Sequence, residues 1–359
     1  MSAGSTDAAP AGERHRLDTL ALEPYLRERE FPGPLAVEQF AGGQSNPTYL
    51  ITGREGRVVL RAKPGPAAKL LPSAHAVERE FRVITALGRA GFPVPRTHFL
   101  CEDEAVIGRA FYVMDYVEGR VLWDQSLPGM RRGERSAVYD EMNRVIAALH
   151  AIDPARAGLA DFGRPGNYFA RQIARWSKQY RASETGRIDA MDRLIEWLPG
   201  HVPPGDERGE ETTVVHGDFR MDNLIFHPSE PRILAVLDWE LSTLGHPLAD
   251  FSYHCMSWHI PPGKFRGIAG LDLDALGIPR EADYIRSYCA RCGRGAIANW
   301  NFYLAYNLFR IAAILQGVAK RALEGTASSA QAQDAGSRAR PLAELGWKYA
   351  EAAIARGEA

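Results

Sequence analysis

The chain has 359 residues, 45% of them hydrophobic and 24% charged, so it is long enough for two lobes that each bury a core. Its formal net charge of −1 gives no overall electrostatic attraction for nucleic acid or an anionic membrane, so neither is expected as the main partner. Four cysteines are too few for a disulfide scaffold. The close pair Cys289 and Cys292 is a weak zinc or redox motif, and two free thiols are the simpler interpretation.

The N-terminal stretch lacks the apolar core of a signal peptide. Small and polar residues predict a disordered tail, which we place at residues 1–20. No later segment is expected to reach the ~20 apolar residues of a membrane span. We therefore expect a cytoplasmic protein without a membrane partner.

The first third of the chain mixes strands with one clear helix. Two apolar stretches between Phe40 and Ile51 flank the segment A-G-G-Q-S-N-P-T, and a further strand is predicted at Val58 to Ala62. Apolar periodicity predicts a helix at Ala76 to Leu87, and Ala110 to Val117 is typical of a buried strand.

The remainder is predicted to be mainly helical, with one β interlude. Helices are predicted at Ser136 to Leu149, Tyr168 to Tyr180, Ile188 to Leu198 and Asn299 to Leu323, and short strands at Thr213 to Val215, Leu224 to Phe226 and Ile233 to Leu237. A strand-rich N-terminal lobe (21–117) and a mainly helical C-terminal lobe (118–359) predict an α+β, protein-kinase-like bilobal fold.

The strongest motif is V-V-H-G-D-F-R-M-D-N-L-I-F, in which Asp218 stands five residues before Asn223. This spacing matches D-x-x-x-x-N of a kinase catalytic loop, and Asp238, at the end of an apolar strand, matches the magnesium-binding Asp. We predict Asp218 as the catalytic base and Asn223 with Asp238 as ligands of Mg²⁺, which prefers oxygen donors. The alternative is Asx turns and a helix cap, which the order and spacing of the three residues disfavour.

The segment between the first two strands is a candidate phosphate-binding loop. Gly43, Ser45 and Asn46 lie where glycine would let backbone N–H groups approach the ATP phosphates, although a simple hairpin also needs glycine. Asp115 and Val117, at the end of the buried strand predicted above, are also assigned to the ATP site.

On the next strand, Arg61 and Lys63 share one face by the two-residue period, and either could reach the ATP phosphates. Arg61 is favoured because it occupies the position of the lysine in V-A-I-K; the alternative is a solvated edge pair. A helical projection places Glu80 inside the apolar stripe of its helix and Glu78 outside it. A buried carboxylate needs a cation, so Glu80 is predicted to pair with Arg61 and Glu78 to be solvated.

Three further residues complete the predicted machinery. His216 is expected to order the catalytic loop through hydrogen bonds rather than to act as a base, and Asp250 to tie a helix start to that loop. Arg220 could contact the γ-phosphate as charge develops on the transferring group.

At these residues the chain resembles the aminoglycoside and choline kinase-like phosphotransferases. It is more similar to the kinase-like domain of acyl-CoA dehydrogenase family members ten and eleven and to its standalone bacterial relatives. The similar segments are G-G-Q-S-N-P-T-Y, V-V-L-R-A-K-P, L-L-P-S-A-H-A-V-E-R-E-F-R-V, the catalytic motif above, L-D-W-E-L-S-T-L-G-H-P-L-A-D and F-R-I-A-A-I-L-Q-G-V.

The resemblance implies an ATP-grasping kinase fold with Asp218 as base and Asn223 and Asp238 as magnesium ligands. It also implies phosphorylation of a small-molecule hydroxyl, with a hydroxylated acyl-CoA as the implied acceptor in some members. Gly217 stands where H-R-D has arginine, and no A-P-E follows Asp238, so protein-kinase activity is not expected.

The predicted acceptor is an anionic or acyl-bearing hydroxy compound. Ser287 to Leu323 contains no Asp or Glu, whereas a site for polycationic aminoglycosides needs carboxylates. Tyr303, Asn307 and Arg310 share one helical face and could hold a carboxylate, thioester or phosphate, unless this face is simply core.

A hydroxyacyl-CoA or hydroxy acid is the favoured acceptor class. The alternatives are an aminoglycoside-type phosphotransferase and a kinase-fold protein that binds nucleotide without turnover. A hydrolase is disfavoured because the sequence contains neither G-x-S-x-G nor H-E-x-x-H.

Overall fold

The computed structural model describes residues 8–10, 17–40, 46–64, 76–263, 265–324 and 330–358. The described residues form two compact units. The first unit comprises Met1–Trp123, Ala155–Leu159 and Arg220–Ser242, and the second comprises Asp124–Pro154, Ala160–Phe219 and Thr243–Ala359. Both units are discontinuous in sequence, so the predicted lobe boundary at residue 117 stays a prediction.

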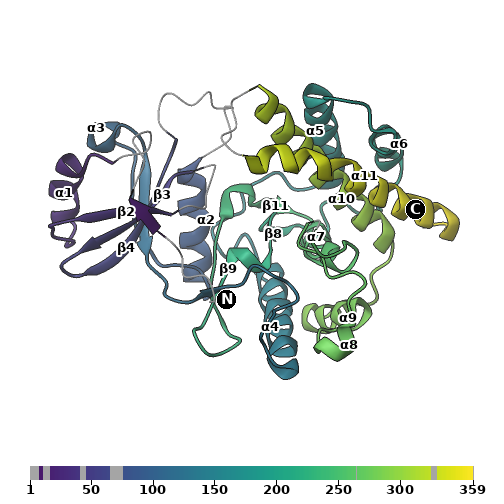
Figure 1. The fold of residues 1–359 in the computed structure, drawn as a ribbon, viewed down its shortest axis with the longest axis horizontal. Coiled ribbons are helices and arrows are strands. Elements are labelled where there is room, and N and C mark those ends of the chain that lie inside the picture. Colours follow the sequence, from purple (N-terminus) through teal and green to yellow (C-terminus); the bar gives the residue numbers. More distant parts are fainter. Residues whose placement is uncertain are drawn as a thin grey trace. The chain divides into compact units, whose positions relative to one another are not determined.

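The first unit is built on a six-stranded antiparallel sheet (Figure 1). The strand order is β1-β2-β3-β4-β6-β5, and the strands span Ala8–Pro10, Ala36–Phe40, Thr48–Gly53, Gly56–Ala62, Phe111–Asp115 and Thr97–Cys101 respectively. The strands predicted in this region are confirmed, and β1 and β5 are additions. β1 and the start of α1 at Thr19 lie within residues 1–20, so these parts differ from the expected disordered tail.

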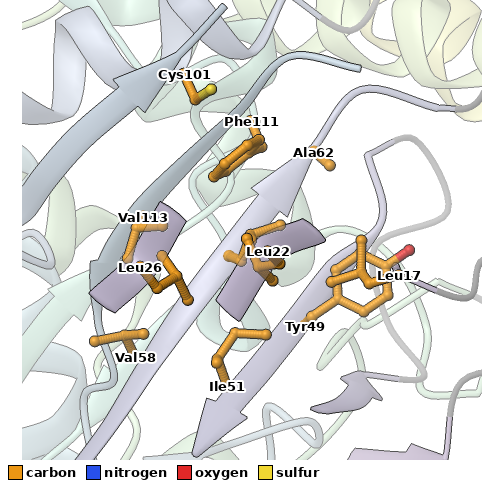
Figure 2. Close-up of a cluster of buried hydrophobic side chains, with 11 residues drawn as sticks. Leu17, Leu22, Leu26, Tyr49, Ile51, Val58, Ala62, Cys101, Phe111 and Val113 are labelled. Atoms are coloured by element: carbon orange, nitrogen blue, oxygen red, sulfur yellow. The ribbon is translucent and has the colours of Figure 1, made fainter. Parts of the chain in front are cut away.

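One face of this sheet packs against the helix α1 (Thr19–Arg27). Leu22 and Leu26 of α1 lie in a buried cluster with Val58 and Ala62 of β4 (Figure 2). Because side chains alternate along a strand, these even-numbered β4 residues face α1 and the odd-numbered ones face the other way.

The helix α2 (Val77–Arg89) lies on that other face. Its Glu80 contacts Arg61 of β4 and Tyr112 of β6. The predicted helix is therefore confirmed, and so is the prediction that Glu80 points inward.

A three-stranded sheet with the order β10-β9-β7 belongs to the first unit as well. Its strands span Ile233–Val236, Leu224–Phe226 and Arg120–Val121, and the short helices η3 (Met221–Asn223) and η4 (Trp239–Leu241) adjoin it in sequence. The short helix α3 (Glu104–Ile107) packs instead against the buried cluster that contains α1. Val121, Ile225 and Ala235 form its small core. This sheet contains most of the β interlude predicted from the sequence.

The second unit is mainly helical. Its α-helices are α4 (Arg132–His150), α5 (Tyr168–Ser183), α6 (Asp189–Trp197), α7 (Pro247–Cys255), α8 (Leu273–Leu276), α9 (Glu281–Cys292), α10 (Trp300–Leu323) and α11 (Ala330–Arg356), joined by the 3₁₀ turns η2 (Leu198–Gly200) and η5 (Met256–Trp258). Its β8 (Thr213–Val215) and β11 (Thr243–Gly245) pair antiparallel. The predicted α+β, kinase-like fold is confirmed by this element order.

The predicted long helix, α10, is a core helix of the second unit. Among the described residues it alone is long and apolar enough to cross a membrane by length and composition, which corrects the expectation that no segment approaches such a span. In the structure, 89% of its apolar window is buried. A helix that is apolar all round is typical of a protein core as well as of a membrane.

Five of the described α-helices were not predicted, namely α1, α3, α8, α9 and α11. The buried positions of α11 include Ala339, Ala343, Ala350 and Ala353. Hydrophobic periodicity is weak where the apolar face is built from alanine, because alanine differs little from its polar neighbours in hydropathy.

Two histidines of the α7 region, the partly buried His246 and the buried His254, predict a pH dependence of stability. Burial lowers the pKa of His246 and of His254 from 6.5 to about 4. Between pH 6.5 and 4 the unfolded chain therefore binds protons that the folded chain does not. The free energy of unfolding should fall as the pH falls through this window, by on the order of 3 kcal/mol per histidine.

Urea denaturation at pH values above and inside this window measures the effect. His254→Gln removes one of the two titrating groups and should flatten the dependence. A slope unchanged by that substitution would show that His254 does not cause it.

Candidate active site

In the first unit, backbone pairing brings the two predicted metal ligands together. β9 and β10 pair so that Leu224 lies opposite Val236. The Leu237 amide then donates to the Asn223 carbonyl at 2.8 Å. Asn223 and Asp238, which flank these paired positions, therefore lie at the same end of the β9–β10 pair.

The backbone of Asp238 is in the left-handed region, with φ +66° and ψ +63°. Positive φ is found in only a few per cent of non-glycine residues, and such conformations cluster at functional sites. The carboxylate of Asp238 and the amide oxygen of Asn223 are the hard donors that Mg²⁺ prefers, so the donor set fits magnesium.

Two protein side chains cannot complete an octahedral magnesium shell. The part of the chain that the structure describes holds no group of three or more His, Cys, Asp or Glu that could bind a metal. The remaining ligands would therefore be phosphate oxygens and water, as is usual for Mg²⁺ at a nucleotide site.

A buried ion pair joins the sheet to α2. Arg61 Nε lies 2.7 Å from Glu80 Oε2, and the two side chains are 10% and 2% exposed. Glu80 also accepts from Asn46 Nδ2 at 2.5 Å and from the Tyr112 hydroxyl at 3.3 Å. Burial raises the pKa of Glu80, while Arg61 and Asn46 oppose that rise. The predicted pair of Arg61 with Glu80 is confirmed, and its contact with ATP stays a prediction.

Arg61 also contacts the predicted metal ligand. Its Nη2 lies 2.9 Å from Asp238 Oδ1 and 3.6 Å from Glu240 Oε2. Burial opposes the charged guanidinium, but attraction from Glu80 and these two carboxylates raises the pKa of Arg61 above its ordinary value. Sequence reasoning missed Glu240, for which the only signal was its place two residues after Asp238.

Lys63, the other basic candidate, pairs with Glu78 of α2. Both side chains are about a third exposed, at 33% for Lys63 and 28% for Glu78. The prediction of a solvated Glu78 therefore needs correction. Glu78 lies outside the apolar stripe as expected, but it is in the first turn of α2, where Lys63 reaches it from the end of β4.

The candidate phosphate loop is described only in part. Gly43 and Ser45 lie outside the described residues. Asn46 is fully buried and its side chain donates to Glu80, so the structure places it in the support of the ion pair. Its assignment to ATP stays a prediction.

The two residues assigned to ATP, Asp115 at the end of β6 and Val117 two residues further on, are also placed in the first unit. The Asp115 amide donates to the Arg96 carbonyl at 2.8 Å, and the Asp115 carboxylate lies 2.7 Å from His98 Nε2. Val117 packs against the small core around Ile225. These contacts neither require nor exclude a nucleotide, so the assignment stays a prediction.

Arg220, predicted to contact the γ-phosphate, belongs to the first unit and immediately precedes η3. Its Nη2 is 3.6 Å from Asp222 Oδ2, and its side chain is 20% exposed. A nearby carboxylate would hold this guanidinium in place. The phosphate contact stays a prediction.

In the second unit, Asp250 of α7 holds the loop that follows β8. Its Oδ2 accepts from the His216 amide at 2.7 Å and its Oδ1 from the Gly217 amide at 2.9 Å. The Asp218 amide donates to His216 Nδ1 at 3.1 Å. Burial acts to raise the pKa of Asp250, but His150 and His216 lower it below its usual range. The predicted structural roles of His216 and Asp250 are confirmed.

The predicted acceptor face of α10 is buried. Tyr303, Asn307 and Arg310 are 4%, 0% and 6% exposed. Asn307 Nδ2 donates to the Ala249 carbonyl at 3.0 Å, and Arg310 Nη2 to the Gly217 carbonyl at 2.6 Å. The geometry thus favours the alternative of a core face. Periodicity could not decide, because α10 is apolar on all sides.

A tyrosine that sequence reasoning missed contacts the predicted base. The Tyr253 hydroxyl donates to Asp218 Oδ1 at 2.6 Å. Its only signal in the sequence is its place three residues after Asp250 on the same helix, which puts both side chains on one face.

The buried ion pair generates a test of the helix register. Glu80→Ala should lower the free energy of unfolding by about 3–5 kcal/mol, because it leaves the buried Arg61 charge without its closest partner. Glu78→Ala is the matched control, and loss of its partly exposed pair should lower the free energy by about 1 kcal/mol at most. Urea denaturation of both variants measures the difference. Equal losses would contradict the distinction between the two glutamates.

Comparison with known proteins identifies relatives of this chain. A profile of the Phosphotransferase enzyme family matches residues 36–284. Acyl-CoA dehydrogenase family member 10 of Mus musculus is 49% identical over 352 residues, which are 97% of this chain and 32% of that protein. Acyl-CoA dehydrogenase family member 11 of Homo sapiens is 40% identical over 350 residues, 96% of this chain and 44% of that protein. The chain thus spans less than half the length of these two relatives.

Solved structures agree with this family. A Ralstonia eutropha protein provisionally assigned as an aminoglycoside phosphotransferase is 61% identical with a TM-score of 0.85, over 94% of this chain and 99% of that one. Choline kinase of Cryptosporidium parvum has a TM-score of 0.62 at 12% identity, over 95% and 97% of the two chains, which shows the fold alone.

The resemblance stated from the motifs is therefore confirmed by both comparisons. The family profile covers well over half of the chain, and the most similar of these relatives match nearly all of it. This chain belongs to the phosphotransferase enzyme family and is a small-molecule kinase.

Proposed function

We propose that this chain uses Mg²⁺ together with ATP to phosphorylate a hydroxyl group of a small molecule. The observation that carries the proposal is the hydrogen bond from the Leu237 amide to the Asn223 carbonyl, beside Asp238 and its 2.9 Å contact with Arg61. The side-chain oxygens of Asn223 and Asp238 are donors that Mg²⁺ prefers, and the buried guanidinium of Arg61 can donate hydrogen bonds to phosphate.

Asp238 and Asn223 would hold the metal through their side-chain oxygens. When bound, magnesium would neutralise the negative charge that develops on the phosphates during transfer. Arg61 carries five N–H donors in a fixed plane, so it can maintain its ion pair with Glu80 while it donates hydrogen bonds to phosphate oxygens. We assign to Arg220 the role of stabilising the negative charge that develops on the transferring phosphoryl group.

We assign to Asp218 the role of general base for the acceptor hydroxyl. The acceptor oxygen attacks the γ-phosphorus and its proton passes to the Asp218 carboxylate. The bond from the γ-phosphorus to the bridging oxygen breaks, and ADP leaves with the bonding electron pair. The hydrogen bonds that fix the loop from His216 to Asp218 support this role, because a general base acts best when it is already oriented.

The acceptor is proposed to be an anionic or acyl-bearing hydroxy compound, such as a hydroxyacyl-CoA or a hydroxy acid. Two observations support this class. The segment from Ser287 to Leu323 has no Asp or Glu that could hold a polycation. The similar region of the mouse protein stands in an acyl-CoA dehydrogenase family member.

An aminoglycoside is the second candidate acceptor. It is favoured by the provisional assignment of the Ralstonia eutropha protein, which is 61% identical to this chain. The acceptor screen described below separates the two classes.

The metal assignment predicts a loss of nucleotide binding in two variants. Asp238→Ala should abolish the magnesium-dependent part of ATP binding, because it removes the only charged ligand proposed for the metal. Asn223→Ala removes a neutral ligand and should weaken that binding without abolishing it. Calorimetric titration with ATP, with and without Mg²⁺, measures both effects. If ATP binding by Asp238→Ala depends on Mg²⁺ as strongly as wild-type binding does, the proposed metal site is wrong.

The acceptor assignment predicts the outcome of a substrate screen. Mg·ATP consumption should be stimulated by hydroxyacyl-CoA or hydroxy-acid candidates and not by kanamycin-type sugars. Asp218→Asn should bind Mg·ATP normally but lower kcat by about 10²- to 10⁴-fold, the usual contribution of a general base. Coupled detection of ADP measures the rates. Strong stimulation by an aminoglycoside would transfer the proposal to the second class, and full activity of Asp218→Asn would refute the base.

A further inference from the structure

The backbone beside the proposed base is held by two charged side chains of the second unit. Asp250 accepts the amides of His216 and Gly217. Arg310, 93 residues further along the chain, donates to the Gly217 carbonyl at 2.6 Å. Gly217 has φ +83°, a conformation that favours glycine and lets this residue present its amide to one partner and its carbonyl to the other.

The carboxylate of Asp218 has a donor on the helix that holds this backbone. The Tyr253 hydroxyl donates to Asp218 Oδ1 at 2.6 Å, and Tyr253 is only 4% exposed. Because Tyr253 follows Asp250 by three residues, both project from one face of α7. A single helix face therefore contacts both the loop backbone and the side chain of the base.

Arg310 also contacts Tyr253. Its guanidinium carbon lies 5.2 Å from the centroid of the Tyr253 ring and 5.7 Å from that of Trp176. A cation within about 6 Å of a ring is attracted to the π electrons. The attraction draws electron density from the phenol and makes its hydroxyl a stronger donor, and burial strengthens the hydrogen bond further.

We propose that Tyr253, supported by Arg310, is a positioning residue that orients the Asp218 carboxylate toward the acceptor hydroxyl. An ionised carboxylate has about four lone-pair sites, so a bond from Tyr253 leaves capacity for the acceptor. Holding Oδ1 sets the plane of the carboxylate and hence the direction from which the acceptor can be deprotonated. Arg310 is thereby reassigned from acceptor binding to support of the base. The inference rests on the proposed function, in which Asp218 takes the acceptor proton.

Kinetics of Tyr253→Phe test this role. The phenylalanine keeps the ring beside Arg310 and removes only the hydroxyl. With Mg·ATP and water as the acceptor, or with an acceptor found in the screen, kcat should fall roughly 10- to 100-fold, the loss expected for one hydrogen bond to a charged group. The KM for ATP should not change, because the nucleotide is assigned to other residues.

Tyr284→Phe is the matched control. Tyr284 is also fully buried, and its hydroxyl lies 2.7 Å from His254 Nε2, so this variant too loses one buried hydrogen bond. It should lose a similar amount of thermal stability and keep the wild-type kcat. A wild-type kcat in Tyr253→Phe, or an equal fall in both variants, would overturn the inference.

A spectroscopic measurement tests the contact without turnover. The full chain has 13 tyrosines, which can be labelled with ¹³C at Cζ, the carbon that bears the hydroxyl. The Tyr253 resonance is the one missing from Tyr253→Phe, and the Tyr284 resonance is the one missing from Tyr284→Phe. Asp218→Asn replaces the charged acceptor and should shift the Tyr253 resonance while leaving that of Tyr284 in place. No shift at Tyr253 would overturn the inference.

The two measurements separate this inference from the function on which it rests. If the wild-type chain releases no ADP with any acceptor, the proposed function fails whatever the spectrum shows. If the wild-type chain turns over and the Tyr253 resonance does not respond to Asp218→Asn, the positioning role alone fails.

Discussion

The first unit depends on one buried guanidinium. Arg61 stands between Glu80 of α2 and the two carboxylates Asp238 and Glu240 that follow β10. An arginine can serve these elements at once because its donors form a planar fork, whereas the single ammonium of a lysine is a point charge. Without it, the buried Glu80 would lose its cation, and a buried charge without a partner is strongly unfavourable. The sheet, α2 and the proposed metal ligand Asp238 are thus joined by the guanidinium that is proposed to contact the ATP phosphates.

The second unit uses a buried charge in a comparable way. The Asp250 carboxylate accepts hydrogen bonds from the amides of His216 and Gly217, which lie in irregular backbone after β8 and have no strand partner there. Arg310 satisfies the carbonyl of Gly217 from a distant helix. In each unit, charged side chains hold a segment that regular secondary structure leaves unsupported. Phosphoryl transfer relies mainly on positioning and charge, so such rigid support is what the chemistry needs.

Much of the fold and of the candidate site could be predicted from local patterns. The spacing of Asp218 and Asn223 and the strand before Asp238 are short-range features, and each was visible in a few consecutive residues. The direction of Glu80 followed from the helical period alone, and the structure places it on Arg61 as expected. The helix α11 was missed because an alanine-rich face carries little hydrophobic contrast.

By itself, the sequence determined the fold class, the order of the catalytic motif and the face on which Glu80 lies, because these follow from spacing and period. Only the tertiary structure decided what each face meets. Periodicity placed Arg310 correctly beside Asn307 on one face of α10, but it could not tell a substrate pocket from the Gly217 carbonyl 93 residues away. The same holds for Tyr253 and Asp218, 35 residues apart, and for Asn46 and Glu80, 34 apart. A side chain's partner depends on how distant segments pack, and local spacing does not contain that information.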